Sequence, residues 1–194
     1  MKKFTLTHQK TLSDPSFQTP RFNVVRVEYS AEDGSVLKHT VIKGKDSVAV
    51  IVFDDQHRVA LLKQFRSTTG RFYYELPAGL IEEGESLLEA ARREVKEETG
   101  IIVSNLSQVS FGPNLLDPSK SNEDFGVAVG TAFCQSSRKL DDNEVISSEI
   151  TWMSLYEVYE RLMAQMNRGT PFKDGLFMSG HSLYAFLAYK FTQE

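Results

Sequence analysis

The chain has 194 residues and a formal net charge of −4, and its apolar and charged fractions are ordinary for a globular protein. This length is enough for one domain with a sizeable core. The negative net charge argues against a protein that binds along a nucleic-acid backbone, because such binding relies on lysine and arginine. We therefore expect no nucleic-acid partner.

The sequence gives no sign of a membrane or of an oxidising compartment. Residues 1–17 begin with a methionine and two lysines, but no apolar stretch follows them as in a secretory signal. No apolar run approaches the roughly 20 residues of a membrane-spanning helix. The single cysteine, Cys134, cannot form an internal disulfide, and we expect it to be a small core or near-core residue. We therefore expect a cytoplasmic protein with no membrane partner.

Strand patterns dominate the first part of the chain. Residues 1–20 are polar and contain two prolines, so we expect an irregular arm. Residues 22–29 alternate and are rich in valine, and residues 36–42 follow the turn dipeptide Asp33-Gly34, so these segments predict a β-hairpin. Further strands are expected at residues 48–53, 58–65 and 73–76.

A helical pattern replaces the strand pattern at residues 86–99. Ser86 and Glu89 form a capping box at its start, and Gly100 is a C-terminal stop. Later strands are expected at residues 109–111, 125–133 and 146–153, and later helices at residues 154–167 and 175–191. Together these elements predict an α+β domain in which helices pack on a mixed sheet.

Three glutamates on the predicted helix give the first indication of chemistry. Glu94, Glu97 and Glu98 have the spacing i, i+3, i+4, which places them on one helix face. Carboxylates this close together repel each other and raise their own pKa values unless a cation compensates them. A hard divalent cation such as Mg²⁺ prefers oxygen ligands and resolves the repulsion. From the residues alone, the alternative is a solvated helix face with salt bridges.

The segment from Gly79 to Ile101 resembles the Nudix box at every specified position. That box consists of Gly, five residues, Glu, seven residues, Arg-Glu-aliphatic, one residue, Glu-Glu, one residue and Gly-aliphatic. The matching residues here are Gly79, Glu85, Arg93-Glu94-Val95, Glu97-Glu98 and Gly100-Ile101. In the Nudix family this box is a loop-helix-loop that holds Mg²⁺ or Mn²⁺ against a diphosphate.

The resemblance implies a fold and a role for individual residues. The fold would be a Nudix fold, with a mixed β-sheet sandwiched by helices and an N-terminal antiparallel hairpin. Glu94, Glu97 and Glu98 would be metal ligands, while Glu85 and Arg93 would brace the loop and the helix. The cofactor would be Mg²⁺, with Mn²⁺ as the alternative.

The flanking residues resemble the ADP-ribose and ADP-sugar pyrophosphatases within that family. The matching runs are Lys63-Gln64-Phe65-Arg66, Tyr74-Glu75-Leu76-Pro77-Ala78-Gly79 and Asp117-Pro118-Ser119-Lys120-Ser121-Asn122. By this resemblance the Ala78 carbonyl would be a further metal ligand, and Arg66 would bind the substrate diphosphate or terminal ribose. Phe22 would stack on the nucleobase. The alternatives are a salt bridge to a surface carboxylate for Arg66 and a strand-packing role for Phe22.

The resemblance places the catalytic base in a late loop outside the box. Here that loop is Asp141-Asp142-Asn143-Glu144, and Glu144 is the candidate. Glu149 is a second candidate, because the alignment of this loop is loose. A glutamate of the box, such as Glu97, is a third.

The expected reaction is metal-dependent hydrolysis of ADP-ribose or a related nucleoside diphosphate sugar, giving a nucleoside monophosphate and a sugar phosphate. One alternative is another Nudix substrate, such as a dinucleoside polyphosphate, NADH or a damaged nucleotide. A more remote alternative is a non-catalytic nucleotide-binding module. Members of the similar group commonly pair through N-terminal strands, which implies a homodimer. We expect residues 1–42 to form an arm and dimerisation hairpin, and residues 43–194 to form the Nudix domain.

Overall fold

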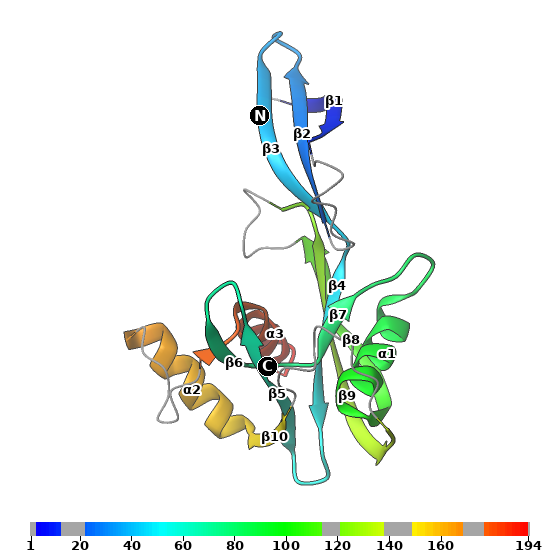
Figure 1. Cartoon of the computed structure of the whole chain (residues 1–194), viewed down its shortest axis with the longest axis vertical. Helices are drawn as coiled ribbons and strands as arrows, with labels where there is room; N and C mark the ends of the chain where they lie inside the picture. The colour runs from blue at the N-terminus through cyan, green and yellow to red at the C-terminus, as the bar shows by residue number, and fades with distance from the viewer. Residues whose placement is uncertain (1–2, 13–21, 114–120, 138–148, 169–176, 194) are drawn as a thin grey trace. The chain divides into compact units, whose positions relative to one another are not determined.

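The computed structural model describes residues 3–12, 22–113, 121–137, 149–168 and 177–193 (Figure 1). Residue contacts divide the chain into two compact units. The first unit comprises residues 1–46 and 112–125, and the second comprises residues 47–111 and 126–194. Each unit contains a sheet of its own, so the two are described separately.

The first unit is built on a three-stranded antiparallel sheet. Its strands, in spatial order, are β1 (Phe4–Thr11), β2 (Phe22–Ala31) and β3 (Val36–Gly44). The expected hairpin of β2 and β3 is confirmed. In its turn, Asp33 accepts hydrogen bonds from the N–H and the hydroxyl of Ser35 at 3.1 and 2.6 Å. Gly34 has a φ of 81°, a backbone conformation that favours glycine.

Strand β1 shows that the expectation of an irregular arm over residues 1–20 was wrong for residues 4–11. These residues pair with β2, and the Thr7 hydroxyl donates to the Glu28 carbonyl oxygen at 3.2 Å. The described side chains of β1 are exposed and mostly polar. Phe4 and Leu6 alternate with threonines, but residues 7–11 are all polar, so the alternation is too short to mark the strand in the sequence. The strand forms because β2 provides partners for its backbone N–H and C=O groups.

The second unit is built on a mixed sheet. Its strands are β4 (Ser47–Phe53), β5 (Arg58–Arg66), β6 (Arg71–Glu75), β7 (Ala78–Leu80), β8 (Ile101–Pro113), β9 (Asp124–Gln135), β10 (Glu149–Ser154) and β11 (Phe177–Met178), with one end of β8 and of β9 in the first unit. The spatial order is β11-β6-β5-β4-β9-β8, while β10 pairs with β5 and β7 with β4. Strands β6 and β11 are parallel, and β5 is antiparallel to β4, β6 and β10.

Three elements differ from their expected bounds. Strand β8 begins at Ile101, although the sequence predicted only residues 109–111, because polar residues interrupt its apolar pattern. Strand β7 is too short to be marked by a periodic pattern. The final helix begins at Gly180, after β11, and not at residue 175. Strand pairing, which the local pattern does not contain, defines β7 and the length of β8, whereas the Ser179 cap begins the final helix.

Helices cover both faces of β4. They are α1 (Leu87–Thr99), α2 (Leu155–Arg168) and α3 (Gly180–Phe191). Val50 and Val52 pack in one buried cluster with Val95 of α1. Because successive side chains of a strand point to opposite faces, Phe53 lies on the face opposite Val52. Its ring centroid lies 5.6 Å from that of Tyr189 in α3. Figure 1 shows α1 on one side of β4 and α2 and α3 on the other, which confirms the expected mixed sheet between helices. Among the described residues, no helix has the length and apolar character to cross a membrane.

Candidate functional site

Helix α1 is fixed at both ends by local contacts. The Ser86 hydroxyl accepts a hydrogen bond from the Glu89 N–H at 3.3 Å, and the Glu89 carboxylate accepts one from the Ser86 N–H at 2.8 Å. This capping box is the one that the sequence predicts. Gly100 ends the helix with a φ of 73°, and its N–H donates to the Lys96 carbonyl oxygen at 2.9 Å.

Arg93 connects helix α1 to the loop that precedes it. Its Nε and Nη2 atoms donate to the carboxylate oxygens of Glu85 at 2.9 and 2.8 Å, and Nη2 also donates to the Leu80 carbonyl oxygen at 2.8 Å. Its Nη1 atom donates to Glu94 at 2.6 Å and to Glu97 at 3.3 Å. Hydrogen bonding to Arg93 holds the pKa of Glu85 below its usual range, and the same contact raises the pKa of Arg93. One guanidinium thus links the loop, the helix and two of the predicted metal ligands.

Two carboxylates of α1 lie against the backbone of residues 78 and 79. The buried Glu98 side chain accepts a hydrogen bond from the Ala78 N–H at 3.0 Å. The Glu94 carboxyl occupies the space beside Gly79, where a Cβ would collide with it. A Cβ at position 79 would therefore displace the Glu94 carboxyl, and Gly79 is not among the glycines with a positive φ.

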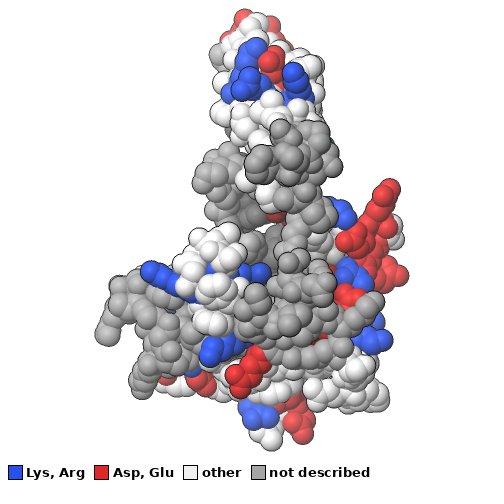
Figure 2. Space-filling model, viewed as in Figure 1, with Lys and Arg blue, Asp and Glu red and all other residues white. Residues whose placement is uncertain are grey.

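The loop between β7 and α1 adds further negative charge. Glu82 and Glu83 are exposed there, next to the partly buried Glu85. The Glu82 N–H donates to the Glu85 carboxylate at 3.1 Å, and Gly84 turns the chain with a φ of 81°. Figure 2 shows acidic side chains gathered on the side of the second unit where this loop lies. The local field therefore favours a cation.

The donor set around residue 78 fits a hard divalent cation. Three carboxylates and one backbone carbonyl are oxygen donors of the kind that Mg²⁺ and Mn²⁺ take. Within the part of the chain that the structure describes, no three acidic, histidine or cysteine side chains converge into a ready metal site. The hydrogen bonds explain this: Arg93 holds Glu94 and Glu97, and the Ala78 N–H holds Glu98. Ligation of a metal by these glutamates stays a prediction.

Arg66, the predicted substrate-binding residue, forms a two-point ion pair with Glu75. The Arg66 Nε donates to one carboxylate oxygen at 2.9 Å, and Nη2 pairs with the other. Arg66 ends β5 and Glu75 ends β6, so the pair crosses two antiparallel strands. The Arg66 side chain is 46% exposed, whereas that of Glu75 is only 12% exposed. Arg66 therefore pairs with a largely buried carboxylate and not with the surface carboxylate of the alternative, and its role in substrate binding stays a prediction.

The other predicted site residues are spread over the chain. Phe22 begins β2 in the first unit, pairs with Gly44 across the hairpin and is 42% exposed. Glu144 lies outside the described residues. Glu149 is exposed at the start of β10, where it pairs with Lys63 of β5. The structure thus places Glu94 and Glu98 against the backbone of residues 78 and 79 and Glu97 beside Arg93, and leaves the roles of Phe22, Glu144 and Glu149 as predictions.

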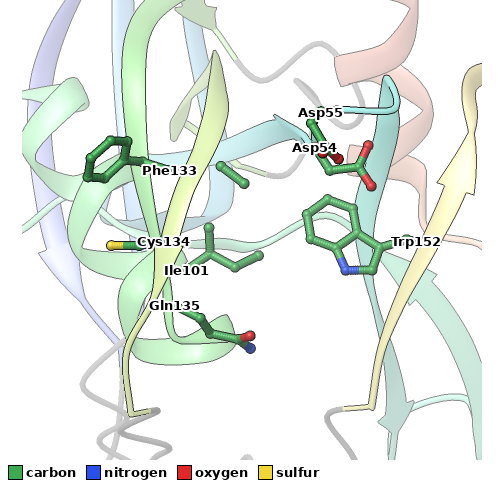
Figure 3. Close-up of a pocket in the computed structure, with 8 residues that line it drawn as sticks. Asp54, Asp55, Ile101, Phe133, Cys134, Gln135 and Trp152 are labelled. Atoms are coloured by element: carbon green, nitrogen blue, oxygen red, sulfur yellow. The ribbon is translucent and has the colours of Figure 1, made fainter.

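Cys134 corrects one expectation about the core. Its side chain is exposed, and it lines a hollow of about 310 Å³ near the end of β9. Asp54, Asp55 and Trp152 line the same hollow (Figure 3). The apolar run before Cys134 suggested burial, but β9 becomes exposed at its C-terminal end. The strand pattern in the sequence does not show where other elements stop packing on the sheet.

Comparison with known proteins decides the family. A family model described as a NUDIX domain matches residues 43–174, more than half of the chain. The chain belongs to the Nudix family. The Nudix box at residues 79–101 lies inside the matched range.

Relatives with assigned names include two ADP-ribose pyrophosphatases and an ADP-sugar pyrophosphatase. The Mycobacterium tuberculosis ADP-ribose pyrophosphatase is 28% identical over 79% of this chain and 74% of that protein. The Bacillus subtilis ADP-ribose pyrophosphatase is 35% identical over 40% of this chain and 42% of that protein. The Mus musculus ADP-sugar pyrophosphatase is 36% identical over 50% of this chain and 42% of that protein. The chain therefore spans less than half the length of the last two relatives.

A solved structure supports the Nudix fold over nearly the whole chain. A crystal structure of an ADP compounds hydrolase has a TM-score of 0.72 and covers 98% of this chain and 94% of that one. The sequence identity is 19%, so this likeness shows the fold alone. The expected Nudix fold is confirmed.

Two residues near the Nudix box were missed by sequence reasoning. Glu75 lies in a run that was matched to the family, but nothing local shows that it pairs with Arg66. Ser182 accepts a hydrogen bond from the Leu76 N–H, although 106 positions separate the two residues. A contact across that distance leaves no periodic signal in the sequence.

Proposed function

We propose that this chain hydrolyses the diphosphate bond of ADP-ribose or a related nucleoside diphosphate sugar. The products are a nucleoside monophosphate and a sugar phosphate. The observation that carries the proposal is the complete Nudix box, folded with Glu94 against Gly79 and Glu98 on the Ala78 N–H. The names of the M. tuberculosis and mouse relatives support the substrate class.

The proposed chemistry divides between a divalent cation and the chain's own residues. When bound, Mg²⁺ or Mn²⁺ neutralises charge on the diphosphate oxygens and polarises a water molecule. The residues that would hold it are Ala78, through its carbonyl, and Glu94, Glu97 and Glu98.

The remaining groups bind the substrate and move a proton. Arg66 would bind the diphosphate or terminal ribose through its guanidinium, which Glu75 orients. Glu144 would accept a proton from the attacking water while the water oxygen bonds to phosphorus and the bridging oxygen leaves. Glu149 and Glu97 are the alternatives for the base.

A substrate panel tests the proposal. It contains ADP-ribose, ADP-glucose, UDP-glucose, GDP-mannose, NADH and diadenosine polyphosphates, and phosphate release is measured after phosphatase coupling. We expect the highest kcat/KM for a nucleoside diphosphate sugar, and AMP and ribose 5-phosphate as products from ADP-ribose. A preference for NADH or diadenosine polyphosphates would overturn the substrate class. No turnover of any compound with Mg²⁺ or Mn²⁺ would favour the non-catalytic module.

A further inference from the structure

We propose that Ser182, on the C-terminal helix α3, is a positioning residue that orients the Ala78 carbonyl at the metal site. The inference rests on the proposed function, because it concerns the residues assigned there to the cation. Ser182 lies beyond residues 43–174, the range that the family model matches. A residue outside the range that the family model matches would thus position a proposed metal ligand, the Ala78 carbonyl.

The contact between Ser182 and Leu76 is buried at both ends. The Ser182 hydroxyl oxygen accepts a hydrogen bond from the Leu76 N–H at 3.0 Å. Each of the two residues is 2% exposed, so water cannot easily replace the acceptor when it is lost. A buried N–H without an acceptor carries the full cost of its desolvation. Removal of the hydroxyl therefore favours movement of the backbone at residue 76.

The three residues from 76 to 78 are each held by a different element. The Pro77 carbonyl accepts a hydrogen bond from the Val50 N–H of β4 at 2.9 Å. The Ala78 N–H donates to Glu98 of α1 at 3.0 Å. Proline has no N–H, so the backbone N–H donors of this run are those of residues 76 and 78. Ser182 provides the acceptor for the first of these donors and Glu98 for the second.

Helix α3 does not need the Ser182 hydroxyl in order to dock on the sheet. Phe186 is fully buried on the same helix, and the Tyr189 ring lies 5.6 Å from Phe53 of β4. Ser179 caps the helix by accepting a hydrogen bond from the Ser182 N–H at 3.3 Å, and its own N–H donates to the Tyr74 carbonyl oxygen. The contacts of Phe186 and Tyr189 are thus separate from the side-chain contact to Leu76, whereas the Ser179 hydroxyl lies 2.9 Å from the Ser182 hydroxyl and belongs to the same hydrogen-bonded cluster. A change at Tyr189, two turns along the helix from Ser182, therefore gives a matched control.

The test compares Ser182→Ala with Tyr189→Leu in the full chain. The first change removes the acceptor of the Leu76 N–H, and the second weakens the packing of the same helix on Phe53 but keeps that acceptor. We expect Ser182→Ala to raise the exchange rate of the Leu76 amide roughly 10-fold or more. We expect its Mn²⁺ affinity, measured by the electron paramagnetic resonance signal of free Mn²⁺, to fall by about 10- to 100-fold, because partners of metal ligands have effects of this size.

The control and a conservative variant separate positioning from simple destabilisation. Tyr189→Leu should lower the unfolding midpoint, because it removes a ring contact with Phe53, while the Leu76 exchange rate and the Mn²⁺ affinity stay within about two-fold of wild type. Ser182→Thr keeps the hydroxyl and should restore most of the Mn²⁺ affinity. Ser182→Cys fills nearly the same space with a weak acceptor, so it tests the same loss if the alanine variant does not fold.

Several outcomes would overturn the inference. One is a wild-type Mn²⁺ affinity in Ser182→Ala or Ser182→Cys, and another is an equal loss in Tyr189→Leu. A wild-type chain that binds no Mn²⁺ would remove the metal site and this inference together. A wild-type chain that binds Mn²⁺ but cleaves no nucleoside diphosphate sugar would refute the proposed function, and the exchange and affinity measurements would still decide the role of Ser182.

Discussion

At the scale of single residues, the three glutamates proposed as metal ligands lie in three different environments. Glu98 is buried on the Ala78 N–H, and Glu94 fills the space beside Gly79. The Glu97 side chain is 35% exposed and contacts Arg93 at 3.3 Å. Their substitution should therefore affect folding to different degrees, while each should remove one proposed metal ligand.

Glu97→Gln should reduce turnover by orders of magnitude and leave the free energy of unfolding nearly unchanged. The reason is the loss of a proposed metal ligand at a position with little packing. Glu98→Gln should lower turnover similarly, because it also removes a proposed ligand, and it should keep the fold because the amide oxygen can still accept from the Ala78 N–H. Steady-state kinetics and urea unfolding measure the two effects. Normal turnover in both variants, or wild-type activity that is indifferent to EDTA, would refute the metal assignment.

Glu144→Gln should lower kcat by about 10²- to 10⁴-fold with little change in KM, since a general base acts mainly in the transition state. The matched comparison is Glu149→Gln, at the start of β10. If only the Glu149 variant shows this loss, the base is Glu149. If neither does, the base is a glutamate of the box.

Arg66→Lys should raise KM roughly 10- to 100-fold, because a lysine cannot reproduce the two-point geometry of a guanidinium. Glu75→Gln should also raise KM, because a neutral amide orients the Arg66 guanidinium less strongly than a carboxylate does. Arg71, which pairs with Arg66 across the β5–β6 ladder, provides the control as Arg71→Lys. Kinetics on the best substrate of the panel measure these effects. An equal change in the Arg71 variant would indicate general surface charge and not a specific contact.

At the scale of elements, the loop and helix of the Nudix box form one hydrogen-bonded unit. The capping box fixes the start of α1, and Arg93 ties its middle to Glu85 and to the Leu80 carbonyl oxygen. Most of these contacts lie within 13 positions of each other along the chain. The unit therefore follows largely from local sequence, and its stability should respond to the charge of Glu85.

Glu85→Gln should destabilise the fold by about 1.5–3 kcal/mol at neutral pH, the range for a hydrogen bond to a charged group. The pKa of Glu85 is lowered from 4.5 by Arg93, so its contribution is complete above that ordinary value and is lost as the pH falls through the lowered value. The gap in unfolding free energy between wild type and variant should thus close as the pH falls below 4.5.

Urea unfolding over a series of pH values measures this gap. The control is Glu83→Gln, which removes an exposed glutamate from the same loop. Its unfolding free energy should stay close to that of wild type at every pH. A gap for Glu85→Gln that stays constant with pH would show that the ion pair with Arg93 is not its cause.

At the scale of the whole molecule, the first unit carries features of an interface. Val36 and Leu37 of β3 are 50% and 43% exposed, and Leu6 of β1 is 46% exposed. Strands β1 and β3 are the edges of the three-stranded sheet. Edge strands with exposed apolar side chains favour association with another chain. The homodimer stays a prediction, and we expect its interface at these strands.

Deletion of residues 1–42 should give a monomer or an aggregate with sharply weakened substrate binding. The deletion removes β1, β2 and most of β3, which include Phe22, the proposed nucleobase contact. Light scattering and sedimentation measure the assembly, and KM measures the binding. A full-length chain that is monomeric at micromolar concentration contradicts the dimer. An unchanged KM after deletion contradicts the shared site and leaves the box chemistry untouched.

The sequence by itself determined the features that depend on neighbours along the chain. The spacing of Glu94, Glu97 and Glu98 places them on one face of a helix, and Ser86 and Gly100 set the bounds of that helix. The hairpin of β2 and β3 follows from alternation around one turn dipeptide. These features were predictable because helical periodicity, capping and turn chemistry act over a few residues.

Only the tertiary structure decided the features that depend on distant partners. Strand β1 exists because β2 pairs with it, and Glu75 acquires a role because β5 brings Arg66 beside it. The Leu76–Ser182 hydrogen bond joins residues that lie 106 positions apart. No local pattern encodes such contacts, because an N–H or a carboxylate has the same chemistry whichever partner the fold supplies. The Nudix box in the sequence therefore indicated the proposed metal ligands, and only the tertiary structure showed which distant residues contact the segments beside them.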